Sequence, residues 1–552
     1  MLKKSKLLLL IIILAGCSNQ MSKKAPLIPM EDFFRNPDKS SFQISPDGQH
    51  IAYMKPWKTR MNVHVINVET TDETRLTSSE DRGIYGYGWL GNNRIGYAKD
   101  DGGDENIHFF AVNIDGTNEI DLTPFENVQA RMIDDLEDDP DHVILGLNKR
   151  DPRIHDAFRV NVTDGTIKLI AENPGNVSGW MTDHDGNLRI AITNDGVKTS
   201  LLYRESESFK TILTTDFKVS VDPLFFTFDN KSLYVSSNRN RDKSAIYTFD
   251  IAKAKERELI FENDQVDVSG LMYSRKRKVL TGVSYTVAKR EMVFFDDWRK
   301  DIQNKLERQL PGYEVGITSF SKDEKKAVVV AFSDKSRGTY YSYDIGNNEL
   351  KELAKISPWL NEDHMAEMKP INYTSRDELT ISGYLTLPVG STGKNLPVVV
   401  HPHGGPWARD TWGYNSEVQF LANRGYAVFQ MNFRGSTGYG REFWESSFKQ
   451  WGKTMQDDIT DGVNWLIDQG IADPDKIAIY GASYGGYATL AGLTFTPDLY
   501  ACGVDYVGVS SLFTFMESMP PYWELYRSMM YEMIGHPEKD KDLLASSSPL
   551  RH

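Results

Sequence analysis

The sequence contains little cysteine and no extended basic segment. Only two of its 552 residues are cysteines, Cys17 and Cys502, so a disulfide framework is excluded and stability has to come from apolar cores. The formal net charge is −14, which argues against a nucleic-acid partner because phosphate binding requires a basic face. Neither a His-Glu-x-x-His helix nor a cluster of cysteine and histidine ligands occurs, and we therefore expect no metal and no other cofactor.

A hydrophobic run long enough to cross a bilayer is also missing. The apolar stretch at residues 7–15 is much shorter than the ~20 residues that a membrane-spanning helix needs. It follows Lys3, Lys4 and Lys6 and precedes small residues, a combination typical of a secretory signal. The stretch Leu14-Ala15-Gly16-Cys17 resembles the bacterial lipobox, whose cysteine is lipidated when the signal is cleaved.

These features predict that residues 1–17 are a lipoprotein signal peptide and that Cys17 anchors the protein to a membrane. The alternative is an ordinary signal peptide with a chance cysteine. Residues 18–39 then form a tether and N-terminal segment. We expect the protein in the cell envelope, outside the cytoplasm, and on the periplasmic or outer-membrane side if the cell is Gram-negative.

A short unit repeats from residue 40 onward. In its first copy, Phe42-Gln43-Ile44-Ser45-Pro46-Asp47-Gly48 leads through a turn to the strand-like segment Ile51-Ala52-Tyr53. Similar turns recur near Asn92, Asp141, Asp185, Asp229, Arg275 and Asp323. The period is about 45 residues, the length of a four-stranded propeller blade. The pattern predicts a seven-bladed β-propeller over residues 40–356, in preference to a β-sandwich or a solenoid of unrelated hairpins.

Beyond residue 357 the pattern changes to strands that alternate with helices. The apolar runs at 397–401, 426–431 and 476–480 are typical of strands buried in a parallel sheet. Residues 416–424 have helical periodicity, and either Asp457 or Asp458 is expected to cap a further helix. This alternation predicts a doubly wound, mostly parallel sheet, and we assign residues 357–552 to an α/β-hydrolase domain.

One motif in this second region points to covalent chemistry. Gly481-Ala482-Ser483-Tyr484-Gly485 follows a predicted strand and opens a predicted helix, which is the setting of a G-x-S-x-G nucleophile elbow. The turn is so tight that side chains two positions from the serine would collide, and glycine is therefore needed there. Ser483 is the predicted nucleophile. The N–H of Tyr484 and one from the loop containing His403-Gly404-Gly405-Pro406 are expected to form an oxyanion hole.

The sequence resembles the prolyl oligopeptidase family, especially its acylaminoacyl-peptidase-like branch. The resemblance rests on the His403–Pro406 stretch, on Asn432-Phe433-Arg434-Gly435-Ser436-Thr437-Gly438-Tyr439-Gly440, and on the elbow with Gly486 and Tyr487, in the family's order. It implies a serine peptidase, a hydrolase that cleaves short peptides through an acyl-enzyme on Ser483, because the propeller restricts access. By the same resemblance the amides of Gly405 and Tyr484 form the oxyanion hole.

The resemblance also suggests how a substrate side chain is held. Trp523-Glu524-Leu525-Tyr526 resembles a W-E-x-Y stretch that lines the specificity pocket of the dipeptidyl-peptidase branch, which implies that Trp523 and Tyr526 hold an apolar or proline side chain. The alternative is that both aromatic residues pack a helix onto the sheet. That branch can use two adjacent glutamates to bind a free amino terminus, and the sequence contains no such pair. Exo- or endopeptidase action, the preferred cleavage site and the oligomeric state stay open.

A triad acid and histidine are not identified. In α/β hydrolases both follow the serine in the chain. Asp505 lies in a predicted strand, His536 in a helix-ending turn and His552 at the last position, so we expect none of them to be a triad member. We therefore expect a fragment of an active peptidase that lacks the last strands of its hydrolase domain and has little activity by itself. A carboxylesterase or other acyl hydrolase, and a non-catalytic propeller lipoprotein, are the alternative functions.

Overall fold

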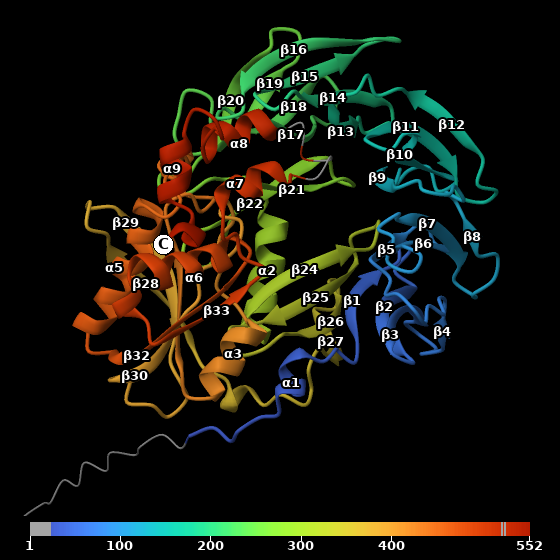
Figure 1. Cartoon of the computed structure of the whole chain (residues 1–552). Coiled ribbons are helices and arrows are strands. Elements are labelled where there is room, and N and C mark those ends of the chain that lie inside the picture. The colour runs from blue at the N-terminus through green and yellow to red at the C-terminus, as the bar shows by residue number, and fades with distance from the viewer. Residues whose placement is uncertain (1–23, 520–522, 524–525) are drawn as a thin grey trace, which may run out of the picture.

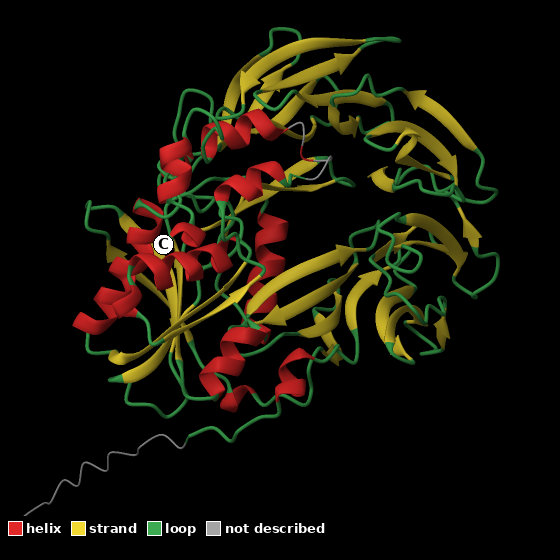
Figure 2. Cartoon of the chain, viewed as in Figure 1, coloured by secondary structure: helices red, strands yellow, loops and turns green. Residues whose placement is uncertain are grey.

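The computed structural model describes residues 24–519, 523 and 526–552. The predicted signal peptide and Cys17 lie outside the described residues. The chain folds into a ring of small antiparallel sheets and, beside it, one larger sheet with helices on both sides (Figures 1 and 2). None of the helices among the described residues is both long and apolar enough to span a bilayer.

The ring contains seven antiparallel sheets within the described residues, which confirms the predicted seven-bladed β-propeller. The first three blades are formed by β1 (Ser40–Ile44), β2 (His50–Trp57), β3 (Arg60–Asn67), β4 (Glu73–Arg75), β5 (Gly86–Trp89), β6 (Arg94–Lys99), β7 (His108–Asn113), β8 (Ile120–Asp121), β9 (Ala130–Asp134), β10 (His142–Asp151), β11 (Ile154–Asn161) and β12 (Ile167–Ala171). The next two are formed by β13 (Val177–Thr182), β14 (Leu188–Asn194), β15 (Lys198–Arg204), β16 (Phe209–Asp216), β17 (Val221–Phe226), β18 (Ser232–Ser237), β19 (Ala245–Asp250) and β20 (Lys255–Phe261). The seventh blade consists of β24 (Glu314–Phe320), β25 (Lys326–Phe332), β26 (Thr339–Asp344) and β27 (Glu349–Lys355).

The sixth blade departs from the four-stranded repeat that we expected. Its described strands are β21 (Gly270–Ser274), β22 (Val279–Thr286) and β23 (Arg290–Phe294), and helix α2 (Asp297–Gln309) follows where a fourth strand would be. The Asp296 side chain caps this helix by accepting a hydrogen bond from the N–H of Arg299. Buried Ile302 and Leu306 attach the helix to the apolar core of the seventh blade. Helical spacing of these apolar residues therefore prevails over the strand period of the repeat.

Contacts between the first and seventh blades close the ring. All four strands of the first blade come from the N-terminal part of the chain, so no strand is shared between the two blades. Instead, the N–H of Ile44 donates to Ser319 Oγ (3.0 Å), and the N–H of Lys322 donates to the carbonyl of Pro46 (2.7 Å). Figure 1 shows β1 beside the strands of the seventh blade.

The larger sheet confirms the predicted doubly wound α/β-hydrolase fold. Its strand order is β28-β29-β31-β30-β32-β33, with antiparallel pairing up to β31 and parallel pairing beyond it. The strands are β28 (Met368–Thr374), β29 (Thr380–Thr386), β30 (Leu396–Val400), β31 (Ala427–Asn432), β32 (Ala472–Ala482) and β33 (Cys502–Tyr506). Among the described residues β33 has a partner on one side only, and Val504 and Tyr506 on it are more than half exposed.

Helices cover both faces of this sheet. One face packs against α3 (Ser416–Asn423), with Val418 against Val428 in a small core. The other packs against α5 (Thr454–Asp468) and α6 (Tyr484–Phe495) in the main core of the domain. The remaining helices are α4 (Arg441–Glu445), α7 (Leu512–Glu517), α8 (Arg527–Met533) and α9 (Lys541–Ser546), with the 3₁₀ turns η1 (Glu362–His364), η2 (Pro497–Leu499) and η4 (Pro549–Arg551).

The prediction that Asp457 or Asp458 caps a helix is wrong. Helix α5 begins at Thr454, so both aspartates lie inside it. The Asp458 carboxylate is buried and accepts hydrogen bonds from Arg434, and it is therefore not available to the helix terminus.

The segment before the propeller packs against the hydrolase domain. It contains helix α1 (Met30–Phe34), whose Phe33 is fully buried and lies 5.9 Å from the ring of Phe420 on α3. The N–H of Ile28 donates to Asn423 Oδ1 at the end of that helix (3.0 Å). The described chain therefore begins on the hydrolase side of the molecule.

Candidate active site

Ser483 lies at a sharp turn between strand β32 and helix α6. Its backbone has φ +58° and ψ −117°, a strained conformation that residues other than glycine rarely adopt. Its N–H donates to the carbonyl of Tyr506 at the end of β33 (3.0 Å), which ties the turn to the neighbouring strand. The residue is exposed. The strand, turn and helix predicted around residue 483 are thus present, and they present its hydroxyl to solvent.

Close backbone packing explains the glycines around Ser483. A Cβ atom on Gly481 would lie 2.5 Å from the carbonyl carbon of Gly485. A Cβ atom on Gly485 would lie 2.3 Å from the carbonyl oxygen of Pro402. Both distances are far below van der Waals contact with backbone atoms that cannot move aside, so only glycine fits.

The first amides of α6 are available to a ligand. The first hydrogen bond of the helix runs from the N–H of Tyr487 to the carbonyl of Ser483 (3.0 Å). Within the part of the chain that the structure describes, no acceptor takes the N–H of Tyr484. The Tyr484 ring is buried, 4.6 Å from that of Trp451 and 5.2 Å from that of Phe433, and this packing holds the start of the helix in place.

The loop after β30 passes close to the serine. A Cβ atom on Gly404 would lie 3.6 Å from Ser483 Cβ and 3.1 Å from the carbonyl of Ala482. Gly405 has φ +123°, in the region that favours glycine. No acceptor among the described residues takes the N–H of Gly405 either. The two amides predicted to form an oxyanion hole therefore come from backbone segments that meet near Ser483, and neither has an acceptor among the described residues.

The side chain of His403 holds this loop in place. Its Nδ1 donates to the carbonyl of Gly404 (2.7 Å), its Nε2 lies 2.9 Å from Ser436 Oγ, and its ring stacks on Phe433 at 4.4 Å. Burial lowers the pKa of the His403 imidazole, which favours the neutral ring. Both ring nitrogens are engaged, so His403 positions the loop and is not a base for Ser483.

Within the described part of the chain, no general base lies next to the serine hydroxyl. Among the described residues no imidazole or carboxylate hydrogen-bonds to Ser483 Oγ. His536 accepts from the N–H of Glu538 within its own turn, and Asp505 accepts from the N–H of Gly508 (2.9 Å). The His552 ring contacts Phe495, at the far end of α6, about 18 Å of helix from its start.

Residues 432–440, the second motif on which the family resemblance rests, are held by a network of ion pairs. Arg434 donates to Asp458 on α5 and to Asp377 in the loop between β28 and β29. Hydrogen bonds from Arg434 hold the pKa of the Asp377 carboxyl well below its usual range. Neither Asp377 nor the pairing of Asp458 was predictable from the sequence, because partners so distant along the chain leave no local pattern.

Trp523 and Tyr526 lie beside helices α7 and α8. The Trp523 ring meets that of Phe515 on α7 edge-on (6.3 Å), and Phe515 stacks on Trp451 (6.0 Å), which contacts Tyr484. Tyr526 directly precedes α8. A line of aromatic rings thus connects Trp523 to the start of α6, and its role in a substrate pocket stays a prediction.

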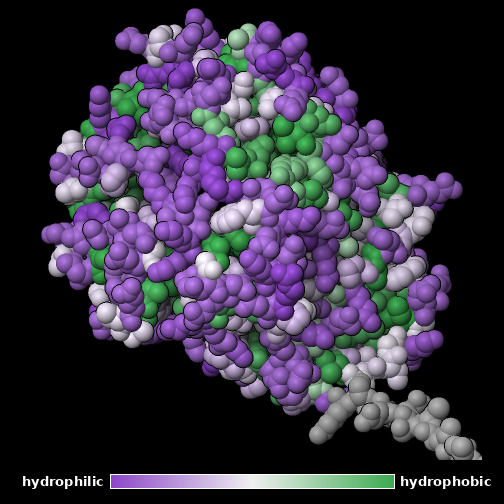
Figure 3. Space-filling model, turned by 180° about the vertical axis from the view of Figure 1, so that it is seen from behind, coloured by the Kyte–Doolittle hydropathy of each residue, from purple (hydrophilic) through white to green (hydrophobic). Residues whose placement is uncertain are grey.

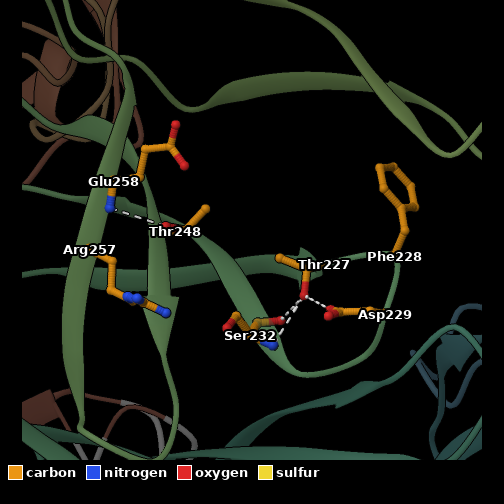
Figure 4. A pocket seen from close by; sticks show the side chains of 7 residues that line it. All are labelled: Thr227, Phe228, Asp229, Ser232, Thr248, Arg257 and Glu258. Carbon is orange, nitrogen blue, oxygen red and sulfur yellow. Dashed lines mark hydrogen bonds between the residues drawn. The ribbon is translucent and has the colours of Figure 1, made fainter.

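A depression of about 680 Å³ lies on the fifth blade, and Ser483 is not among the residues that line it (Figure 4). Thr227 and Asp229 at its floor are engaged in turn hydrogen bonds with each other and with Ser232. No nucleophile with an activating partner lines it. Elsewhere in the described part of the chain, no group of three or more histidine, cysteine or acidic side chains is arranged to hold a metal ion.

Comparison with known proteins places the chain in a family. The model of the "Prolyl oligopeptidase family" matches residues 412–552. "Dipeptidyl aminopeptidase BIII" of Pseudoxanthomonas mexicana is 34% identical over 545 residues, covering 95% of this chain and 78% of that protein. The chain belongs to the prolyl oligopeptidase family. "Dipeptidyl peptidase family member 6" of Caenorhabditis elegans is a further relative, 28% identical over 572 residues and covering 95% of this chain and 77% of that one.

Solved structures show the same fold. A puromycin-hydrolyzing peptidase of Mycobacterium tuberculosis superimposes with a TM-score of 0.72 at 19% identity, over 96% of this chain and 86% of that one. As a member of the prolyl oligopeptidase family, the protein is a serine-type peptidase with a β-propeller beside an α/β-hydrolase domain.

Proposed function

We propose that the protein hydrolyses short peptides through an acyl-enzyme on Ser483. The observation that carries the proposal is an exposed, strained serine near the amides of Gly405 and Tyr484, which have no acceptor among the described residues. These features together suit attack on a carbonyl carbon and stabilisation of the oxyanion that results.

The reaction follows from this arrangement. Ser483 Oγ attacks the scissile carbonyl, whose oxygen gains negative charge and accepts hydrogen bonds from the Gly405 and Tyr484 amides, near the positive end of α6. The leaving amine takes a proton, and a water molecule then hydrolyses the ester on Ser483. The serine proton has to pass to a base, and none is within reach among the described residues. Turnover at full rate therefore requires an imidazole and its carboxylate partner from outside them.

Peptides are the proposed substrates, and the propeller would restrict their size. The names of two relatives, a dipeptidyl aminopeptidase and a dipeptidyl peptidase, support testing peptides with a free amino terminus first. Trp523 and Tyr526 are proposed to hold an apolar or proline side chain next to the scissile bond.

Acylation by an activated ester tests the nucleophile directly. A p-nitrophenyl ester has a good leaving group and needs little help from a general acid, so it should acylate Ser483 even where peptide turnover is slow. We expect mass spectrometry to find one adduct, on Ser483, which is absent in Ser483→Ala and retained in Ser208→Ala, a control at an exposed serine of the propeller. An equal adduct in Ser483→Ala would contradict the proposal.

A carboxylesterase would use the same nucleophile. The two functions separate when matched ester and dipeptidyl anilide substrates are compared in a preparation that contains the base. A peptidase should cleave the anilide with free amino terminus, whereas an esterase should cleave only the ester.

We also propose that Cys17 carries a lipid anchor in the cell envelope. The first described residues expose apolar side chains, with Leu27 73%, Met30 53% and Phe34 50% exposed. Figure 3 shows some hydrophobic groups near the start of the described residues, and a larger hydrophobic patch elsewhere on the same face. Such side chains suit a position at a bilayer surface. Labelling with an alkyne fatty acid should mark the wild type and Cys502→Ala, whose cysteine is exposed, but not Cys17→Ala. Label that persists in Cys17→Ala would refute the anchor.

A further inference from the structure

The loop that carries Gly405 is held from both domains. On the hydrolase side, the N–H of Asp410 donates to Asn432 Oδ1 (2.7 Å), and the N–H of Thr437 donates to the carbonyl of Ala408 (2.9 Å). Arg409 links the loop to the propeller. Its Nη1 donates to the carbonyl of Thr286 (3.3 Å) and its Nη2 to that of Val287 (3.2 Å).

The propeller partner is the tip of the hairpin between β22 and β23, residues 286–289. Beyond the two carbonyls bound by Arg409, the carbonyl of Ala288 accepts from Tyr384 Oη on β29 (2.8 Å). The ammonium of Lys289 lies 3.5 Å from the ring centroid of Trp412. Four successive residues of the hairpin tip therefore contact the hydrolase domain, and three of these contacts are with the segment 409–412 that continues from Gly405.

Tyr439 joins Arg409 to a second propeller contact. Its hydroxyl accepts from Arg409 Nη2 (2.8 Å) and from Asn432 Nδ2 (2.8 Å), while its carbonyl accepts from Lys243 Nζ (2.6 Å) in the propeller. The guanidinium also lies over the Tyr439 ring, 4.3 Å from its centroid. The neighbouring Gly438 leaves room for it, since a Cβ atom there would lie 2.7 Å from Arg409 Nη1.

We propose that Arg409 is a positioning residue. When the propeller hairpin is bound to Arg409, the Gly405 amide is held in its place on the same loop. The inference rests on the proposed function, in which that amide stabilises the oxyanion. Arg409 is four residues from Gly405 on the same loop. A displacement of about 1 Å at such a donor is enough to weaken catalysis strongly. When the hairpin withdraws, Arg409 loses two of its three acceptors, and the loop loses its attachment to the propeller.

Hydrogen exchange measured by mass spectrometry tests the coupling without any need for turnover. In Arg409→Ala we expect faster exchange in peptides covering residues 402–412 and 284–290, and in Arg409→Lys an intermediate effect. Tyr384→Phe removes a second hairpin contact, beside Arg409, and should raise exchange at 284–290. Arg376→Ala, which breaks an ion pair with Asp461 away from the propeller, should change neither segment. Unchanged exchange at 402–412 in Arg409→Ala would overturn the proposal.

The rate of acylation adds a functional readout. With a p-nitrophenyl ester, Arg409→Ala should acylate Ser483 about tenfold more slowly than the wild type, because one oxyanion donor is displaced but not removed. Arg376→Ala should match the wild type. If the wild type itself is not acylated, the proposed function fails, and the exchange data still decide the coupling. Normal acylation in Arg409→Ala with altered exchange would show that the loop moves without serving the oxyanion, and this also overturns the inference.

Discussion

Arg434 and Asp458 form an ion pair in the interior of the hydrolase domain, with 2.7 Å between Nη2 and Oδ1 and 2.9 Å between Nε and Oδ2. Both side chains are buried, and the backbone N–H of Arg434 donates to the same carboxylate (2.9 Å). The ion pair therefore connects the loop after β31 to helix α5. Because this loop also contains Ser436 and Tyr439, the ion pair supports the residues that hold His403 and Arg409.

Asp458→Asn should destabilise the protein strongly. The substitution leaves a buried guanidinium without its main counter-charge, and we expect the free energy of unfolding to fall by about 3–5 kcal/mol. Urea denaturation followed by tryptophan fluorescence measures it. The control Arg376→Ala breaks a more exposed pair and should cost about 1 kcal/mol or less. A loss in Asp458→Asn no larger than in the control would show that the buried pair contributes little.

Gly485→Ala should damage the elbow. Its new Cβ would lie 2.3 Å from the carbonyl oxygen of Pro402, so either the loop after β30 or α6 has to shift. We expect a lower melting temperature and no acylation of Ser483 by an activated ester. The control is Gly86→Ala on the first strand of the second blade, where nothing lies within 4 Å of the added atom and the effect should stay within about 0.5 kcal/mol. Unimpaired acylation in Gly485→Ala would mean that the backbone is less closely packed than the structure indicates.

Stability should fall in acid partly through His403. Burial lowers the pKa of this imidazole in the folded state, whereas the unfolded chain keeps a value of about 6.5. Between the two pKa values the unfolded state binds more protons, so stability is fully present above about pH 6.5 and is lost as the pH falls below it. The groups facing His403 are Asp410, His401 and Arg409. The pH dependence of the unfolding free energy should be shallower between pH 5 and 7 in His403→Asn than in the wild type, by up to about one proton. Equal slopes would indicate that His403 titrates normally.

Trp523→Ala should change substrate preference more than reactivity. If Trp523 holds an apolar or proline side chain, its removal should slow acylation by prolyl or leucyl activated esters by about tenfold and leave glycyl esters nearly unaffected. The ratio of the two rates is the measurement, because it cancels any general effect on Ser483. Trp57→Ala in the first blade serves as the control. An unchanged ratio would favour the alternative, in which Trp523 only packs against Phe515.

Much of the fold was predictable because its signals are local. Alternation with a period of two and turns at regular spacing indicated the seven blades, and the glycines around Ser483 indicated the sharp turn. Local signals also misled in two places. The repeat suggested a fourth strand in the sixth blade where α2 forms, and Asp458 looked like a helix cap although it pairs with Arg434. In the second case a partner distant along the chain outweighs a local preference.

The sequence by itself determined the two architectures and the position of Ser483, since strand periodicity, helix periodicity and the need for glycine in a tight turn all act over a few residues. Only the tertiary structure decided which distant groups meet. The carbonyls of Thr286 and Val287 reach Arg409 because the propeller packs against the hydrolase domain. The loop that carries Gly405 passes close to Ser483 because parallel strands end at the same edge of a sheet. Backbone carbonyls and amides are identical in every residue, so no sequence pattern can indicate which of them will be used.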